Sequence, residues 1–255
     1  MGAGCYFLPM TSAAYDDPRL AALYDALNPP DASDAFFASV VEGAPKRVLD
    51  IGCGTGRLAV DLARGGHQVT GADPAQGMLD MARGRPDGDL VEWVKIGADK
   101  LALDRKFDRV LMTGHVFQVF PDDAATIRAL ETAARHLAPG GKLAFDTRNP
   151  AARAWRNWTT NKTRRRLSVP GIGPVQISYD ARRVTAEHVE YATIFEFGPD
   201  DRIEAPDRLR FVSKAAVERL LAASGLAADA IYGDWDCSAF SEDSPEIIVV
   251  AGCSA

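Results

Sequence analysis

An acid and three glycines lie close together where an apolar run ends. Residues 48–56 read VLDIGCGTG, so Asp50 precedes Gly52, Gly54 and Gly56. Glycine tolerates positive φ and lets a ligand approach the backbone, so this spacing after a strand predicts a binding turn. Dinucleotide sites generally use G-x-G-x-x-G, with a helix N-terminus that receives a pyrophosphate. The G-x-G-x-G spacing behind a carboxylate favours a positively charged ligand, because Asp50 would repel a phosphate.

Two further acids follow the next two apolar runs. Asp73 ends the run QVTGAD, and Asp99 lies in IGAD. A carboxylate at the end of the second strand can accept hydrogen bonds from both hydroxyls of a ribose. Asp99 is placed to accept a hydrogen bond from an exocyclic amine. With Asp50, these acids predict a ligand made of an amine, a ribose and an aminopurine.

These residues need a scaffold that brings strand ends together, and the chain alternates strand and helix patterns as far as Asn149. Strands are expected at RVLDIG, QVTGAD, EWVKIG, DRVLMTG and KLAFDT, and helices at DPRLAALYDALN, DAFFASVVEG, GRLAVDLARGG, GMLDMARGR and DAATIRALETAARHLAPGG. Short apolar runs separated by helices predict βαβ units and a buried parallel sheet. Ligands bind at the carboxyl edge of such a sheet, where the acids and glycines lie.

The pattern changes after Asn149. PVQISYDARRV and EHVEYATIFEFG alternate apolar and polar residues, and IEAPDRLRFVS follows a GPDDR turn, which predicts an antiparallel β insertion. A helix capped by Ser213 comes next, and then two strands joined by a short polar loop, which should pair antiparallel at the sheet edge.

The fold class is therefore α/β: a Rossmann-like, doubly wound, mostly parallel seven-stranded sheet with an antiparallel edge hairpin, plus the antiparallel β insertion after the fifth strand. We divide the chain into an N-terminal helical cap (1–45), a ligand-binding core (46–149), the insertion (150–212) and a C-terminal helix with the final strands of the core (213–255).

Five ordered motifs make the chain resemble a class I S-adenosylmethionine-dependent methyltransferase of the small-molecule type over Arg47–Asp146. They are VLDIGCGTG, GADPAQGML, IGAD, FDRVLMTG and LAPGGKLAFD. The resemblance implies S-adenosyl-L-methionine as cofactor and S-adenosyl-L-homocysteine as product. It implies that Asp50, with the Gly52 and Gly54 backbone, holds the methionine part. The other implied cofactor residues are Tyr24 over the cofactor, Asp73 at the ribose, Pro74 in the ribose motif, Met78, Ala98 and Asp99 at the adenine, and Thr113 and Gly114 beside the sulfonium. The alternatives are that such acids cap helices or turns, and that Met78 and Tyr24 pack in the core.

His115 lies in MTGHVFQVF, at the end of the fourth predicted strand. A sulfonium is already a strong electrophile, so the protein mainly has to align the acceptor and exclude water. A base is needed only where the acceptor must lose a proton, and histidine changes charge near neutral pH. We predict His115 as the catalytic residue, with cofactor contact or packing as alternatives. No metal site is predicted, because His67, His136 and His188 share no ligand spacing.

The surroundings of the acceptor are expected from the β insertion, which often forms a lid or dimer surface in proteins of this class. Seven basic residues and no acid lie between Thr147 and Pro170: Arg148, Arg153, Arg156, Lys162, Arg164, Arg165 and Arg166. One interpretation is an anion-attracting wall beside the active site, and the other is solvated charge on a flap or edge strand. Arg148, Trp155 and Trp158 are predicted to contact an anionic or aromatic substrate, with packing as the alternative for the tryptophans.

Composition limits the class of protein. The 255 residues are 47% hydrophobic and carry a formal net charge of −6, which disfavours general attraction to nucleic acid. Cys5, Cys53, Cys237 and Cys253 show no C-x-x-C spacing, and no run approaches the roughly 20 apolar residues of a membrane span. We expect a cytoplasmic protein that acts on a small molecule without membrane contact, and a homodimer formed through the insertion.

The expected function is methyl transfer by in-line displacement to an N, O or C atom of a small acceptor. Three alternatives stay open: an S-adenosylmethionine-binding protein that transfers no methyl group, a transfer RNA or protein methyltransferase, and an NAD-dependent oxidoreductase. The G-x-G-x-G spacing and Asp99 argue against the oxidoreductase, and no RNA-binding module is appended.

Overall fold

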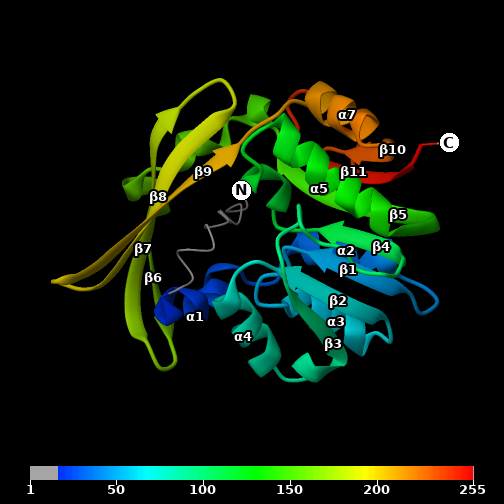
Figure 1. The fold of residues 1–255 in the computed structure, drawn as a ribbon. Helices are drawn as coiled ribbons and strands as arrows, with labels where there is room; N and C mark the ends of the chain where they lie inside the picture. The colour runs from blue at the N-terminus through cyan, green and yellow to red at the C-terminus, as the bar shows by residue number, and fades with distance from the viewer. Residues whose placement is uncertain (1–16, 255) are drawn as a thin grey trace.

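The computed structural model describes residues 17–254, so the part of the predicted helical cap that contains Cys5 lies outside the described residues. Its larger sheet contains β1 (Arg47–Ile51), β2 (Gln68–Asp73), β3 (Val91–Lys95), β4 (Phe107–Met112), β5 (Leu137–Arg148), β10 (Leu226–Tyr232) and β11 (Glu246–Cys253). The strand order is β10-β11-β5-β4-β1-β2-β3 (Figure 1). β11 runs antiparallel to β5 and β10, and the remaining neighbours pair in parallel. The predicted doubly wound sheet with an antiparallel edge hairpin is confirmed.

Helices cover both faces of this sheet. α2 (Ala32–Val41) and α3 (Arg57–Arg64) pack on one face, and α5 (Asp123–His136) and α7 (Lys214–Ala223) pack on the other. α4 (Gln76–Gly84) connects β2 to β3. The loops that leave β1, β2, β3 and β4 therefore open at one edge of the sheet, which is where ligands bind in this architecture.

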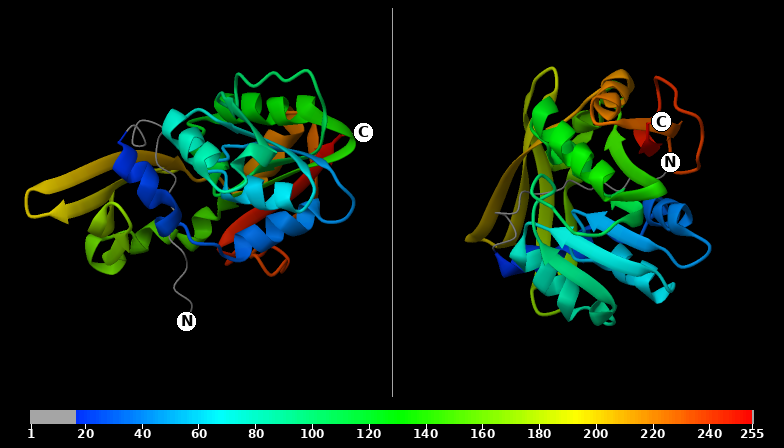
Figure 2. Two further views of the ribbon diagram at one scale, coloured as in Figure 1. Left: turned by 90° about the horizontal axis from the view of Figure 1, so that it is seen from below. Right: turned by 45° about the vertical axis from the view of Figure 1, so that its right-hand side comes forward.

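The predicted insertion forms a second, antiparallel sheet in the order β6-β7-β8-β9. Its strands are β6 (Arg165–Val169), β7 (Gly173–Val184), β8 (His188–Gly198) and β9 (Asp201–Arg210). Figure 1 shows this sheet beside the core, and Figure 2 shows the β8–β9 hairpin extending away from it. β6 was not predicted, because its arginines make the segment look polar. Leu167 and Val169 alternate with polar residues there and are partly buried.

Helix α1 (Pro18–Leu27) joins the two sheets through two of its faces. Leu20, Leu23 and Leu27 pack against Val175, Ile177, Phe195 and Ala205 of the second sheet. Ala21 and Tyr24 pack on the other side against Met78 and Ala75. This arrangement places α1 beside α4, at the carboxyl edge of the larger sheet (Figure 1).

Short helical segments complete the chain: η2 (Gly88–Leu90), η3 (Val116–Val119), η4 (Pro150–Ala152), η5 (Ala154–Asn157) and α6 (Thr160–Thr163). Within residues 17–254, Cys53, Cys237 and Cys253 are free thiols. A search of the same residues for a helix with the length and apolarity of a membrane span finds none.

Candidate active site

Two adjoining cavities open at the carboxyl edge of the larger sheet. The first has a volume of about 550 Å³ and the second about 600 Å³. Tyr24, Gly52, Thr113 and Gly114 line both of them, and Gly54 lines the first. The first is also lined by the predicted residues Asp73, Pro74, Met78, Ala98 and Asp99, and the second by Asp50. The structure therefore brings all eleven predicted cofactor residues to one continuous region.

Asp73 is held by the backbone on both sides of its strand end. The Gly54 N–H donates to Asp73 Oδ2 at 3.0 Å, and the Ala75 N–H donates to Oδ1 at 2.8 Å. Burial raises the pKa of the Asp73 carboxyl, while these two amides act in the opposite direction. Each oxygen accepts one amide and can accept a further hydrogen bond, so the carboxylate can receive two hydroxyl groups from the cavity side.

Asp50 lies deeper, at the end of β1, and is 1% exposed. Its Oδ1 is buried without a hydrogen-bond partner. Burial, with a smaller contribution from Asp73, raises the pKa of the Asp50 carboxyl to about 7. A buried carboxylate without a partner is costly, so this position fits a cationic group that enters the second cavity.

The three glycines of the turn serve different contacts. All three have positive φ, at 76° for Gly52, 54° for Gly54 and 74° for Gly56. A Cβ on Gly52 would lie 2.5 Å from Val116 Cγ2, and one on Gly54 would lie 3.5 Å from the Tyr24 hydroxyl. The Cβ on Gly54 would only be in ordinary contact with Tyr24, so positive φ is what favours glycine there, whereas the close approach of Val116 shows that Gly52 allows η3 to pack on the turn.

Gly56 lines neither cavity, and a Cβ there would lie 2.3 Å from Trp93 Cη2. The third glycine of the motif thus serves the packing of α3 against β3.

Tyr24 is fixed over the turn by its neighbour Asp25. Thr55 Oγ1 donates to Asp25 Oδ1 at 2.6 Å, and the Arg85 guanidinium forms an ion pair with the same carboxylate. Burial raises the pKa of the Tyr24 hydroxyl, so it stays protonated at neutral pH. Sequence reasoning did not find this connection, since the three residues lie far apart in the chain and match no motif.

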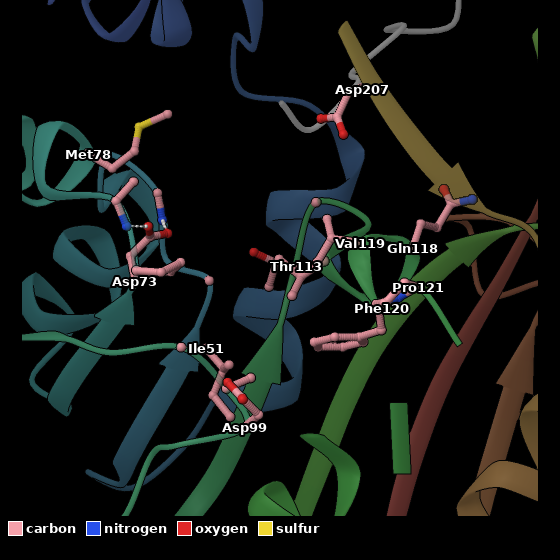
Figure 3. A pocket seen from close by; sticks show the side chains of 18 of the residues that line it. Ile51, Asp73, Met78, Asp99, Thr113, Gln118, Val119, Phe120, Pro121 and Asp207 are labelled. Carbon is pink, nitrogen blue, oxygen red and sulfur yellow. Dashed lines mark hydrogen bonds between the residues drawn. The ribbon is translucent and has the colours of Figure 1, made fainter. Parts of the chain in front are cut away.

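Figure 3 shows the first cavity between Met78 and Asp73 on one side and Gln118, Phe120 and Pro121 on the other. Met78 is buried, and Asp99 is exposed at the rim. The second sheet contributes one wall of the first cavity, made of His188, Asp207, Arg208 and Arg210. The sequence had instead predicted substrate contacts at Arg148, Trp155 and Trp158.

Gln118 fixes this wall to the core. Its Nε2 donates to the Arg210 carbonyl at 3.0 Å, and its Oε1 accepts from Arg148 Nη1 at 2.8 Å. Arg148, predicted to contact substrate, therefore positions a residue that lines the cavity. Arg148 itself is not among the described residues that line either cavity.

His115 lines the second cavity beside two carboxylates. Its backbone N–H donates to Asp146 Oδ2 at 3.0 Å. Its ring Nε2 lies 3.2 Å from Asp146 Oδ2 and 3.0 Å from Glu246 Oε2. Residues other than glycine rarely adopt positive φ, so the φ of 62° at His115 marks a special turn that brings the ring to these acids.

The ring of His115 faces these carboxylates, while its Nδ1 is buried. Burial raises the pKa of the Asp146 carboxyl to about 6, although His115 acts in the opposite direction. Glu246 is the most exposed of the three, with 13% of its side chain accessible. The ligating atoms lie within 4.8 Å of one another and could hold a metal ion, which the sequence did not predict. His115 stays a predicted base, but Glu246 is the member nearest to solvent.

The predicted aromatic substrate wall is wrong for Trp158. Its side chain is fully buried among the residues of the second sheet, with its ring centroid 5.6 Å from that of Tyr191. Trp155 packs edge-on against Phe211, at 4.7 Å between centroids, and lines neither cavity. Tryptophans bury large apolar areas, and here they form the core of the insertion.

The basic segment also lies away from the cavities. None of its seven basic residues is among the described residues that line them. β6 is an edge strand, and Arg164 and Arg166 are exposed beside and on it. The interpretation as solvated edge-strand charge therefore fits Arg164 and Arg166, whereas Arg148 is buried and fits neither interpretation.

Comparison with known proteins agrees with this geometry. Residues 48–141 match the methyltransferase domain family. The chain is 38% identical over 107 residues to a cypemycin N-terminal methyltransferase of Streptomyces sp., which covers 42% of this chain and 43% of the relative. It is 36% identical over 114 residues to a ubiquinone biosynthesis O-methyltransferase of Idiomarina loihiensis, covering 43% and 45%. The matches thus span less than half the length of these relatives.

Among solved structures, the CcbJ methyltransferase from Streptomyces caelestis superposes with a TM-score of 0.79, at 24% identity, over 96% of this chain and 100% of that one. This similarity shows the fold, including the second sheet. Residues 48–141 thus match a methyltransferase domain, in agreement with the order of the motifs, and the chain has the fold of a solved methyltransferase.

Proposed function

We propose that the protein binds S-adenosyl-L-methionine across both cavities and transfers its methyl group to a small molecule. The observation that carries the proposal is the convergence of Asp50, Asp73 and the glycine turn at one sheet edge. Asp73 retains acceptor capacity for two hydroxyls, and Asp50 has a buried oxygen without a partner. A ligand that carries a ribose and an ammonium group requires these two features, an acceptor for two hydroxyls and a carboxylate for the cation.

The fit assigns a role to each part of the edge. Asp50 would hold the methionine ammonium, with the backbone of Gly52 and Gly54 beside it. Asp73 would accept the ribose hydroxyls, and Met78 with Ala98 would contact the adenine. When bound, the cofactor supplies an electrophilic methyl group on a sulfonium. The chain's own task is then to orient the acceptor for in-line attack and to exclude water.

The acceptor would reach this point between Tyr24 and the Thr113–Gly114 turn, which line both cavities. Helix α1 and the wall of β9 cover the region from the side opposite the sheet. The proposal covers transfer to N, O or C, and the similar proteins include one named for N-terminal methylation and one named for O-methylation. Cytoplasmic location and a homodimer through the second sheet remain predictions.

Calorimetric titration with S-adenosyl-L-homocysteine tests the proposal. Asp73→Ala removes two hydrogen bonds to a charged acceptor, so the affinity should fall by about tenfold or more. Asp80→Ala, at an exposed aspartate of α4, is the matched control and should bind like the wild type. Unchanged affinity in a folded Asp73→Ala protein would remove the ribose assignment. Binding without any methyl transfer to mixtures of small acceptors would favour the non-transferring alternative.

A further inference from the structure

The second cavity is strongly acidic. Among the described residues that line it, six are carboxylates: Asp31, Asp34, Asp50, Asp146, Asp234 and Glu246. Arg57 is the one guanidinium among those lining residues, and it already binds Asp34 at 2.8 Å. The first cavity differs, because Arg208 and Arg210 stand beside its acids. The field in the second cavity therefore favours a cation and opposes an anion.

Half of these carboxylates have other roles. Asp31 accepts from Ser33 and Asp34 accepts from the Asp31 backbone N–H, so both form the capping box of α2. Asp234 accepts from the Trp235 backbone N–H. These three carboxylates stabilise a helix start and a loop. Asp50, Asp146 and Glu246 then remain to be explained.

Two of the remaining carboxylates line the cavity and have a buried oxygen without a hydrogen-bond partner. Oδ1 of Asp50 and Oδ1 of Asp146 are buried without a hydrogen bond, and these residues are 1% and 0% exposed. The cofactor ammonium would satisfy Asp50. On the side of the cavity formed by Asp146 and Glu246, His115 and the buried Arg148 already offset part of the negative charge. Asp146 Oδ1 still lacks a hydrogen-bond donor, and a second cationic group in the cavity would supply one, because buried polar atoms are normally hydrogen-bonded.

We propose that the acceptor is a cationic amine and that Glu246 binds its nitrogen, with Asp146 behind it. This inference rests on the proposed function, since the amine must lie beside the methyl donor. Glu246 and Gly114 line the same cavity, which places the carboxylate near the point of transfer. This proposal replaces the anionic acceptor expected from the sequence, because the basic residues of the 147–170 segment line neither cavity.

The chemistry of an amine acceptor fits this group of residues. The bound ammonium gives one proton to the Glu246 carboxylate, and the freed lone pair of the nitrogen forms the N–C bond to the methyl carbon. The C–S bond breaks as the N–C bond forms, and its electron pair stays on sulfur as a neutral thioether. The methylated nitrogen then carries the positive charge. His115 Nε2, 3.0 Å from Glu246 Oε2, is placed to receive the proton next.

Equilibrium binding tests the inference without knowledge of the natural acceptor. Protein saturated with S-adenosyl-L-homocysteine is titrated with cyclohexylammonium and, separately, with cyclohexanol, which has the same ring without the charge. The wild type should bind the cation at least about tenfold more tightly, which corresponds to about 1.4 kcal/mol. Glu246→Gln should lose this preference. Glu242→Gln removes the same charge from an exposed residue of the loop that precedes β11, and this variant should keep the preference.

Equal binding of the two probes by the wild type, or no binding of either, would overturn the inference. So would a preference for the cation that survives in Glu246→Gln. Stoichiometric binding of Mn²⁺ or Zn²⁺ that depends on Glu246 would also overturn it, because the carboxylates would then be metal ligands. The initial titration with S-adenosyl-L-homocysteine separates the two proposals. If that ligand does not bind, the proposed function fails; if it binds normally, only the amine assignment is at stake.

Discussion

Replacing Asp50 by asparagine should stabilise the cofactor-free protein and abolish cofactor binding. The carboxyl is 1% exposed, and one of its oxygens has no partner. Burial raises its pKa from 3.8 to about 7. This difference corresponds to about 4 kcal/mol in the free energy of unfolding once the group is ionised in both states. Asparagine keeps the shape of the side chain and removes the charge.

The predicted effect has a defined pH dependence. Because the folded pKa is raised, the stability linked to this proton is fully present below pH 3.8 and is lost as the pH rises to about 7. The wild type should therefore lose free energy of unfolding over this range, and Asp50→Asn should lose less. The stability difference between the two proteins should grow with pH and become constant above about pH 7.

Urea unfolding at a series of pH values measures this difference, and calorimetry with S-adenosyl-L-homocysteine measures the loss of binding. Asp104→Asn, at an exposed aspartate, is the control and should follow the wild type at every pH. The reasoning is refuted if Asp50→Asn is no more stable than the wild type at alkaline pH, or if the difference shrinks as pH rises. Retained cofactor binding in Asp50→Asn would separately remove the assignment of the ammonium to this residue.

Two further predictions concern packing and surface charge. Gly56→Ala should lower the free energy of unfolding by about 2 kcal/mol more than Gly140→Ala. Both glycines have a φ of 74°, but a Cβ at position 140 would meet nothing within 4 Å, whereas one at position 56 would clash with Trp93. Equal losses, measured by urea unfolding, would exclude close packing as the reason for the third glycine. The Arg164→Ala, Arg166→Ala double variant should retain wild-type kcat/KM for an acceptor at both low and high salt, because these exposed residues line neither cavity. A drop confined to low salt would restore the positive wall.

The sequence by itself determined the parts of the site that follow strand ends. Asp50, Gly54 and Asp73 each come directly after or at the end of a short apolar run, and parallel strands joined by helices bring such ends to one edge. Their grouping could be predicted because the local periodicity of the sequence indicates alternating strands and helices, and this alternation indicates a parallel sheet. The alternation of Val189, Tyr191 and Phe195 likewise predicted the second sheet, and these residues are buried there.

Asp146 could have been found by the same signal, since it lies near the end of the fifth strand. Its carboxylate was read only as part of a motif, although it follows the pattern of Asp50 and Asp73. Local sequence could not show in this way that the tryptophans of the insertion point into its core and not into a substrate cavity. Trp158 is as well suited to a pocket as to a core, and only the packing of β8 and β9 around it decided for the core.

The tertiary structure alone decided which residues complete the site. Glu246 meets His115 across 131 positions of sequence, because β11 pairs antiparallel with β5 and so begins at the carboxyl edge. Gln118 joins the core to β9, and Asp25 fixes α1 over the glycine turn. None of these contacts follows from a local period. They depend on the pairing of distant strands and the docking of one helix. Burial of apolar surface stabilises both, and the spacing of residues along the chain does not indicate which surfaces will meet.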